Sequence, residues 1–201
     1  MGDRLTEGLF KISEMGDLEQ AMQYIGKGAD VNGSDAKGNT PLVYACMHGF
    51  ADTARLLIDS GADVNAKNAE SVTPLMCACQ NNQAGVVRLL VSRGADINVR
   101  DSVGDTPLTF ASKQGNMEIA RMLIDSGADI NASDGAGNTA LMCAIAKKCA
   151  GMINFFLARG AHVKIANKEN KTAFDIAMER GLSRVANEIK FKIADSYKKV
   201  S

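Results

Sequence analysis

The sequence predicts an all-helical protein built from one short unit that repeats along the chain. Two residue types recur at a fixed interval of 33 residues, and self-similarity at a fixed period is the signature of a repeat architecture. Glycines keep this interval at Gly28, Gly61, Gly94, Gly127 and Gly160, and threonines keep it at Thr40, Thr73, Thr106, Thr139 and Thr172. We therefore expect a series of equivalent helical units.

The repeated residues lie inside two short strings that recur along the chain. The threonines begin TPLVYA, TPLMCA, TPLTFA, TALMCA and TAFDIA, and the glycines lie in KGADVN, SGADVN, RGADIN, SGADIN and RGAHVK. These strings resemble the ankyrin repeat family in period and in the T-P-L-H-x-A signature. The resemblance covers nearly the whole chain and implies a solenoid of stacked helix-turn-helix units joined by β-turn or hairpin loops.

The repeats divide the chain into six units within one expected domain, residues 1–201. The full repeats are expected at 35–67, 68–100, 101–133 and 134–166, between an N-terminal capping repeat at 1–34 and a C-terminal capping repeat at 167–201. Each helix pair is too short to bury its apolar face alone and must stack on its neighbours. Both end units are rich in Lys, Arg, Glu and Gln, which is typical of capping repeats with a polar outer face.

The first helix of each repeat is predicted by its start and stop signals. Threonine is a good N-cap, and proline fits the first helical position, where a missing N–H costs nothing. The three prolines of the chain follow such threonines, at Pro41, Pro74 and Pro107. In the first full repeat this helix is expected to stop at Gly49, and a second helix through Leu56, Leu57 and Ile58 is expected to end before Gly61.

Some positions depart from the family pattern. The histidine of the signature is replaced by Val43, Met76, Thr109 and Met142, so its hydrogen bonds are expected to be missing. Asn82 and Lys148 stand where Gly49 ends the first helix. A left-handed lysine costs on the order of 1 to 2 kcal/mol. Repeat four, which also lacks the proline, is therefore expected to fray first.

The cysteines fall at core positions of the repeat, with one exception. Cys77 and Cys79 lie on a first helix, at positions that are apolar or small in the other repeats. Tyr44 is equivalent to Cys77, and Met178 is equivalent to Cys79. We expect buried, free thiols rather than a metal site or a disulfide. Cys149 follows two lysines at a position held by other residue types elsewhere, so we expect it to be partly exposed and more reactive.

No motif predicts catalysis, a cofactor or a metal. GAGNTA at residues 135–140 fits a dinucleotide fingerprint, but its Gly137 is equivalent to Gly38 and Gly104 in the turn before each N-cap, and no βαβ unit surrounds it. The two histidines, His48 and His162, belong to no ligand set or catalytic pattern. We therefore predict that the protein is not an enzyme.

Composition limits the choice of partner and location. Lys plus Arg and Asp plus Glu each number 23, so no net field favours nucleic acid or an anionic membrane. No signal sequence or apolar run of membrane-spanning length is present. The five cysteines are an odd number and no secretory signal accompanies them. We therefore expect reduced thiols and a cytoplasmic location, and a nuclear or host-cell cytosolic location stays open.

The resemblance implies a monomer that acts as an adaptor, scaffold or inhibitor and binds another protein, through a concave groove of turn tips and first helices. Met47, Val72 and Val103 place apolar side chains where exposure is expected. The residues that correspond to this groove are Lys37, Asn39, Met47, His48, Glu70, Val72, Gln80, Asn81, Ser102, Val103, Asp105, Lys113, Gln114, Asn138 and Lys147.

Two alternatives stay open. The string LIDSGADVNAK resembles the context in which ankyrin-repeat asparagines are hydroxylated by an oxygenase, which would single out Asn65, with weaker equivalents at Asn32, Asn98 and Asn131. These asparagines could instead only shape the turn, through local hydrogen bonds. The other alternative is a structural module of a larger assembly.

Overall fold

The computed structural model describes residues 2–198, and across that range it contains helices and loops but no strand longer than an isolated bridge. The helices belong to two compact units, Met1–Val103 and Gly104–Ser201, and each is described by itself. The expectation of one domain over residues 1–201 stays a prediction.

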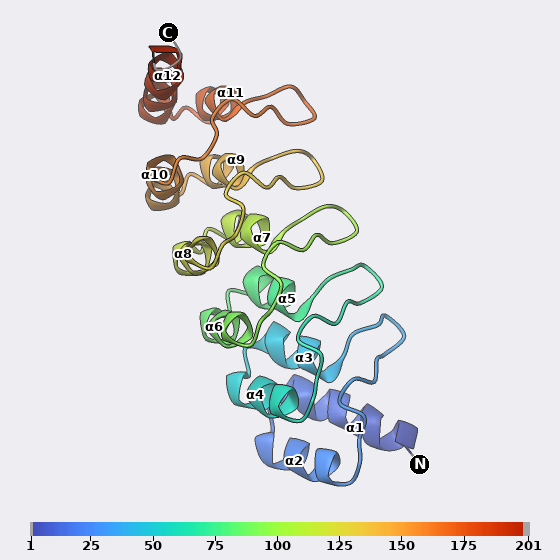
Figure 1. Cartoon of the computed structure of the whole chain (residues 1–201). Coiled ribbons are helices and arrows are strands. Elements are labelled where there is room, and N and C mark those ends of the chain that lie inside the picture. The colour runs from blue at the N-terminus through green and yellow to red at the C-terminus, as the bar shows by residue number, and fades with distance from the viewer. Residues whose placement is uncertain (1, 199–201) are drawn as a thin grey trace. The chain divides into compact units, whose positions relative to one another are not determined.

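The first unit consists of three stacked helix pairs (Figure 1). The odd-numbered helices pack on one another in one layer, and the even-numbered helices form a second layer behind them. Long loops project from the side of the odd-numbered layer. The helices are α1 (Gly2–Met15), α2 (Leu18–Gly26), α3 (Pro41–His48), α4 (Ala51–Asp59), α5 (Pro74–Gln80) and α6 (Ala84–Ser92).

The second unit repeats this arrangement. Its first helices α7, α9 and α11 pack in sequence, and each is followed by a partner helix on which it packs. The bounds are α7 (Pro107–Gln114), α8 (Met117–Asp125), α9 (Ala140–Ala146), α10 (Ala150–Ala158), α11 (Ala173–Glu179) and α12 (Ser183–Lys198). The prediction of an all-helical fold made of stacked helix pairs is therefore confirmed.

The predicted start signals are confirmed. In every repeat the threonine hydroxyl accepts a hydrogen bond from the backbone N–H three residues later, and the prolines occupy the first helical turn of α3, α5 and α7. Thr109, which replaces the histidine of the signature, makes a bond of its own, because its hydroxyl accepts from the Thr106 N–H at 2.8 Å. Asp175 does the same for Thr172 at 2.8 Å.

The stop signals are also confirmed, including the unfavourable one. Gly49 and Gly115 end α3 and α7 with φ of 84° and 79°. Asn82 and Lys148 take the same left-handed conformation, with φ of 60° and 59°. A lysine therefore adopts backbone angles that favour glycine.

The core lies between the two helix layers of each unit. Its largest fully buried side chains include Leu42, Leu57, Leu75, Leu123 and Phe156. One position that we expected to be mostly buried is not. Met178 on α11 is 54% exposed, because no later first helix of the described chain packs on α11. Its equivalent Ser112 lies on α7, which packs on α9, and is fully buried.

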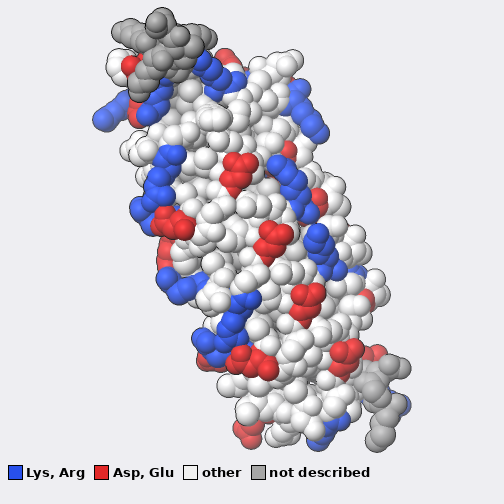
Figure 2. All heavy atoms as spheres, in the orientation of Figure 1, with Lys and Arg blue, Asp and Glu red and all other residues white. Residues whose placement is uncertain are grey.

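The charges give no single-sign surface. On the face of each unit that Figure 2 shows, Asp and Glu side chains lie along the middle and Lys and Arg side chains lie on both sides of them. This matches the equal numbers of acidic and basic residues in the sequence. No helix within residues 2–198 is both long and apolar enough to cross a membrane.

Candidate functional site

Each projecting loop is organised by an aspartate or asparagine at its base. The side chain of Asp35 accepts hydrogen bonds from the backbone N–H groups of Lys37 and Asn39, both at 2.8 Å. Asn68, Asp134 and Asn167 hold their loops in the same way. Sequence reasoning missed these residues, although they share the 33-residue interval of the glycines. The loops are therefore rigid hairpins rather than loose connections.

Neighbouring hairpins within a unit are hydrogen-bonded to one another. The Ala69 N–H donates to the Lys37 carbonyl at 2.9 Å, and the Lys168 N–H donates to the Ala136 carbonyl at 2.9 Å. The Asn68 amide donates to Asn39 Oδ1 at 2.9 Å. These bonds fix the spacing of the hairpin tips, and therefore the shape of the surface beside them.

Two residues that we predicted to bind a partner belong to these hairpin contacts. Asn39 is only 8% exposed and bonds to both Asp35 and Asn68, so its side chain is engaged within the hairpins, and its role as a contact residue stays a prediction. Its equivalent Asn138 is half-buried and accepts from the Asn167 amide at 2.8 Å. An amide whose oxygen and nitrogen are already hydrogen-bonded within the protein has few groups left to bond to a partner.

In the first unit, the hairpins and first helices enclose an open depression of about 440 Å³. Cys77 lies in its wall and is 4% exposed, whereas its equivalent Tyr44 is half-exposed and donates a hydrogen bond to Asp35 at 2.7 Å. This repeat position therefore lies at the edge of the core, beside the hairpins, rather than deep within it. The depression brings together six predicted residues: Lys37, Asn39, Met47, Glu70, Val72 and Gln80.

Four predicted residues of the first unit lie outside this depression. His48 is exposed and stacks on Phe50 with ring centroids 6.1 Å apart, and Asn81 donates to the Cys77 carbonyl at 2.9 Å. Ser102 and Val103 lie in the next hairpin. Val103 is 67% exposed, which is unusual for a large apolar side chain.

In the second unit the corresponding depression, also of about 440 Å³, is charged. It contains the predicted residues Lys113, Asn138 and Lys147, whereas Asp105 and Gln114 lie outside it. The Lys113 ammonium bridges Asp105 at 2.6 Å and Asp134 at 3.1 Å.

The opposite charges of Lys113 and its two aspartate partners stabilise one another's ionised forms. Burial disfavours the charged form of Lys113, but its bonds to Asp105 and Asp134 outweigh that effect and raise its pKa. Burial likewise opposes ionisation of Asp134, but the Asn138 N–H and the Lys113 ammonium hold its pKa below the usual value. Both groups are therefore charged at neutral pH.

The thiols follow the expected division. Cys46, Cys77, Cys79 and Cys143 are buried and free, and burial raises the pKa of Cys77 and of Cys143 to about 12. Cys149 is half-exposed at the N-terminal end of α10. Among the described residues, no group of three or more His, Cys, Asp or Glu side chains could hold a metal ion.

The glycine-rich string at residues 135–140 forms a hairpin. Gly137 has a φ of 82°, and its N–H donates to the Asp134 carbonyl at 2.9 Å. These are the features of the equivalent Gly38 turn, where the N–H donates to the Asp35 carbonyl at 2.9 Å. The string therefore belongs to the repeat rather than to a nucleotide site.

The asparagine considered as a hydroxylation site is engaged in the structure. Asn65 Oδ1 accepts from the Asp96 N–H at 2.8 Å, and its amide nitrogen lies 3.4 Å from the Gly94 carbonyl. Asn32 makes the equivalent bonds to Asp63 and Gly61 at 2.8 and 2.9 Å. These side chains join the loop after one second helix to the loop after the next.

The comparisons with known proteins agree with this architecture. A family model described as ankyrin repeats, in three copies, matches residues 9–101 and 94–167, which is more than half of the chain. The search of curated proteins gave no match. The chain therefore belongs to the ankyrin repeat family, whose members are generally protein–protein interaction modules and typically non-catalytic.

Proposed function

We propose that this protein is a non-catalytic adaptor, scaffold or inhibitor that binds a partner protein through its hairpin tips and first helices. The observation that carries the proposal is the depression of the first unit, in which Met47 and Val72 are half-exposed beside the charged Lys37 and Glu70. An apolar centre with a polar rim is the usual anatomy of a protein interface.

The rigidity of this surface supports the same proposal. Ala69 and Ser102 each donate a backbone hydrogen bond to the preceding hairpin, at 2.9 and 2.8 Å. A preorganised surface loses little conformational entropy when it binds, which favours affinity. We further propose that the protein acts as a monomer in a reducing, cytoplasm-like compartment, where its free thiols would stay reduced.

The test is a comparison of partner capture from the native cell by the wild type and by a variant with Met47, Val72 and Val103 all changed to alanine. Because these side chains are half-exposed or exposed, we expect capture of one discrete partner to fall by at least about tenfold while the melting temperature is unchanged.

A matched control changes exposed apolar residues elsewhere in the same unit, Met15 and Met22, to alanine. This control should leave capture unchanged. Equal capture by all three proteins would rule out the proposed surface, and a lower melting temperature of the triple variant would place its residues in the core.

Hydroxylation of Asn65 stays a proposal of lower rank. The hydrogen bonds of its side chain to Asp96 and Gly94 support the structural role instead. The intact mass of the protein from its native cell distinguishes the two, because an added oxygen on the peptide that contains Asn65 would restore the substrate hypothesis. Its absence would leave the asparagine with the structural role alone.

A further inference from the structure

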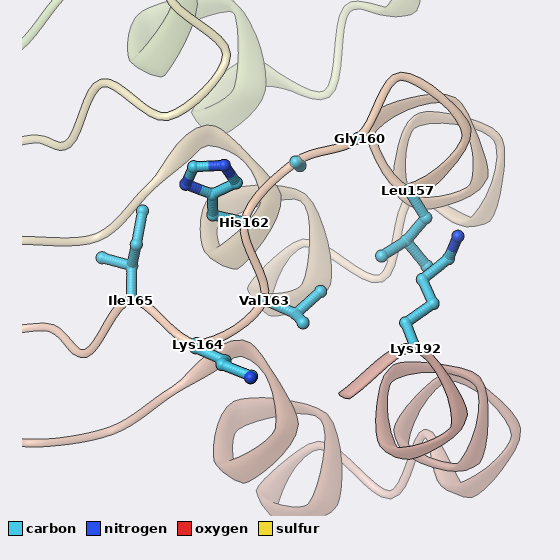
Figure 3. A pocket seen from close by; sticks show the side chains of 8 residues that line it. Leu157, Gly160, His162, Val163, Lys164, Ile165 and Lys192 are labelled. Carbon is cyan, nitrogen blue, oxygen red and sulfur yellow. The ribbon is translucent and has the colours of Figure 1, made fainter. Parts of the chain in front are cut away.

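A different hollow lies in the second unit, between the end of α10, the loop at residues 160–165 and α12 (Figure 3). Its volume is about 580 Å³, within the range of small-molecule sites. None of its lining residues was predicted to bind a partner. They are Leu157, Gly160, Ala161, His162, Val163, Lys164, Ile165 and Lys192.

The lining combines an apolar floor with basic side chains. Leu157 and Val163 are buried, at 2% and 9% exposed. Figure 3 shows Leu157 and Lys192 directed toward each other from α10 and α12, with Val163 directed toward the space between these helices. Neither Asp nor Glu is among the lining residues. The hollow is therefore suited to an apolar molecule that carries a negative charge.

Comparison with the other repeats explains why Lys192 is available. Arg93, at the end of its second helix, pairs with Asp59 at 2.6 Å, and Arg159 pairs with Asp125 at 2.8 Å. In both pairs the acid lies 34 residues before the arginine. Lys192 occupies the next equivalent position, but the residue 34 places earlier is Ala158.

No salt bridge joins Lys192 to any side chain that the structure describes. Glu188, one helical turn earlier on α12, does not pair with it. The repeat thus keeps a cation at this site and omits the anion that accompanies it elsewhere. The loop also lacks a negative charge that the other repeats have, because His162 replaces the aspartate found at Asp63, Asp96 and Asp129.

We propose that this hollow binds a small aliphatic carboxylate of medium chain length. Its carboxylate occupies the place of the missing acid beside Lys192, and its alkyl chain covers Leu157, Val163 and Ile165. A charge-assisted hydrogen bond at one end and buried methylenes at the other account for the two kinds of lining. The site is separate from the proposed protein-binding surface, so either can fail without the other.

The test is a titration of the full chain with decanoate, below its micellar concentration, and with decanol. Methyl NMR signals of Leu157, Val163 and Ile165 report on the floor. We expect saturable shifts with decanoate, and an affinity for decanol about tenfold lower, because the alcohol lacks the charge that Lys192 recognises.

Two variants separate the charge from the apolar floor. Lys192→Ala should weaken decanoate binding about tenfold and leave decanol binding unchanged. Ala158→Asp keeps the lysine but supplies an acid at the position equivalent to Asp59 and Asp125, and should weaken decanoate binding similarly. The Ala158→Asp variant also tests the role of the Lys192 charge if Lys192→Ala does not fold. The control is Lys190→Ala, on the same helix but outside the hollow, which should bind as the wild type.

Absence of saturable shifts, or equal affinity for decanoate and decanol, would overturn the proposal. So would decanoate binding that neither Lys192→Ala nor Ala158→Asp weakens. A saturable response to an acidic peptide, in a protein that does not bind decanoate, would assign the hollow to a protein ligand instead.

Discussion

At the residue scale, Lys148 shows how a repeat tolerates an unfavourable backbone conformation. Its φ of 59° is the left-handed conformation that Gly49 and Gly115 adopt at the same place. In Lys148 the Cβ atom makes this conformation costly, but the helices on either side are packed, and the chain must reverse direction between them. The strain is local, so a single substitution can release it.

We expect Lys148→Gly to raise the free energy of unfolding by up to about 1 kcal/mol, because the relief of strain exceeds the entropy that glycine adds to the unfolded chain. Urea unfolding measures it. The control is Lys147→Gly, where φ is −80° and glycine should destabilise. A Lys148→Gly variant less stable than the wild type would contradict this account.

Cys149 differs from the other four cysteines in the exposure of its thiol. It is half-exposed, whereas Cys77 is 4% exposed and burial raises its pKa to about 12. Since the thiolate is the reactive form, we expect Cys149 to react with a thiol reagent at least about tenfold faster in the folded protein. Peptide mapping after brief labelling gives the two rates, and equal rates would show that exposure does not control reactivity here.

At the scale of the element, the hairpin at Asp134 combines two roles. Its carboxylate orders the loop through the Ala136 and Asn138 N–H groups and also pairs with Lys113. Asn68 and Asn167 order their hairpins without a charge, which shows that the ordering role needs only a side-chain oxygen. The charge of Asp134 is therefore a separable contribution.

Asp134→Asn should keep the hairpin but lose the ion pair with Lys113. Since the folded pKa of Asp134 is lowered, its contribution is present above the unfolded value of about 3.9 and is lost as the pH falls through the folded pKa. We expect the variant to be less stable than the wild type at pH 7 and the difference to shrink below about pH 4.

Urea unfolding across this pH range measures the effect. Glu188→Gln serves as the control and should show no such trend, because Glu188 is exposed and forms no ion pair with any residue that the structure describes. A difference between Asp134→Asn and wild type that does not vary with pH would mean that the carboxylate charge contributes nothing.

At the scale of the whole molecule, each repeat is stabilised chiefly by its neighbours, so stability need not be uniform along the chain. Repeat four carries the lysine in the left-handed position and lacks the proline of α3, α5 and α7. Its α10 nevertheless buries Phe156 completely. The weakness is therefore expected in α9 rather than in the whole repeat.

Hydrogen exchange of the native protein tests this expectation. Backbone amides of α9 should exchange faster than those of α5 and α7, the equivalent helices that begin with proline. Equal protection of the three helices would contradict the expectation, and faster exchange throughout α10 as well would extend the weakness to the whole repeat.

The sequence by itself determined the helical units, their order and their ends, because these depend on local chemistry that recurs with the period. Thr40 caps a helix and Gly49 ends one through bonds and angles within a few residues. It also separated the buried cysteines from Cys149, since position in the repeat predicts burial.

Only the tertiary structure decided which side chains are free to act. Asn39 looked like a contact residue, but contacts with Asp35 and with Asn68 of the next hairpin satisfy its amide. Nothing in the sequence singled out Lys192 among the lysines of the C-terminal unit, whereas the structure places it beside an apolar hollow. Such roles depend on neighbours a full repeat away, where folding rather than local sequence sets the distance.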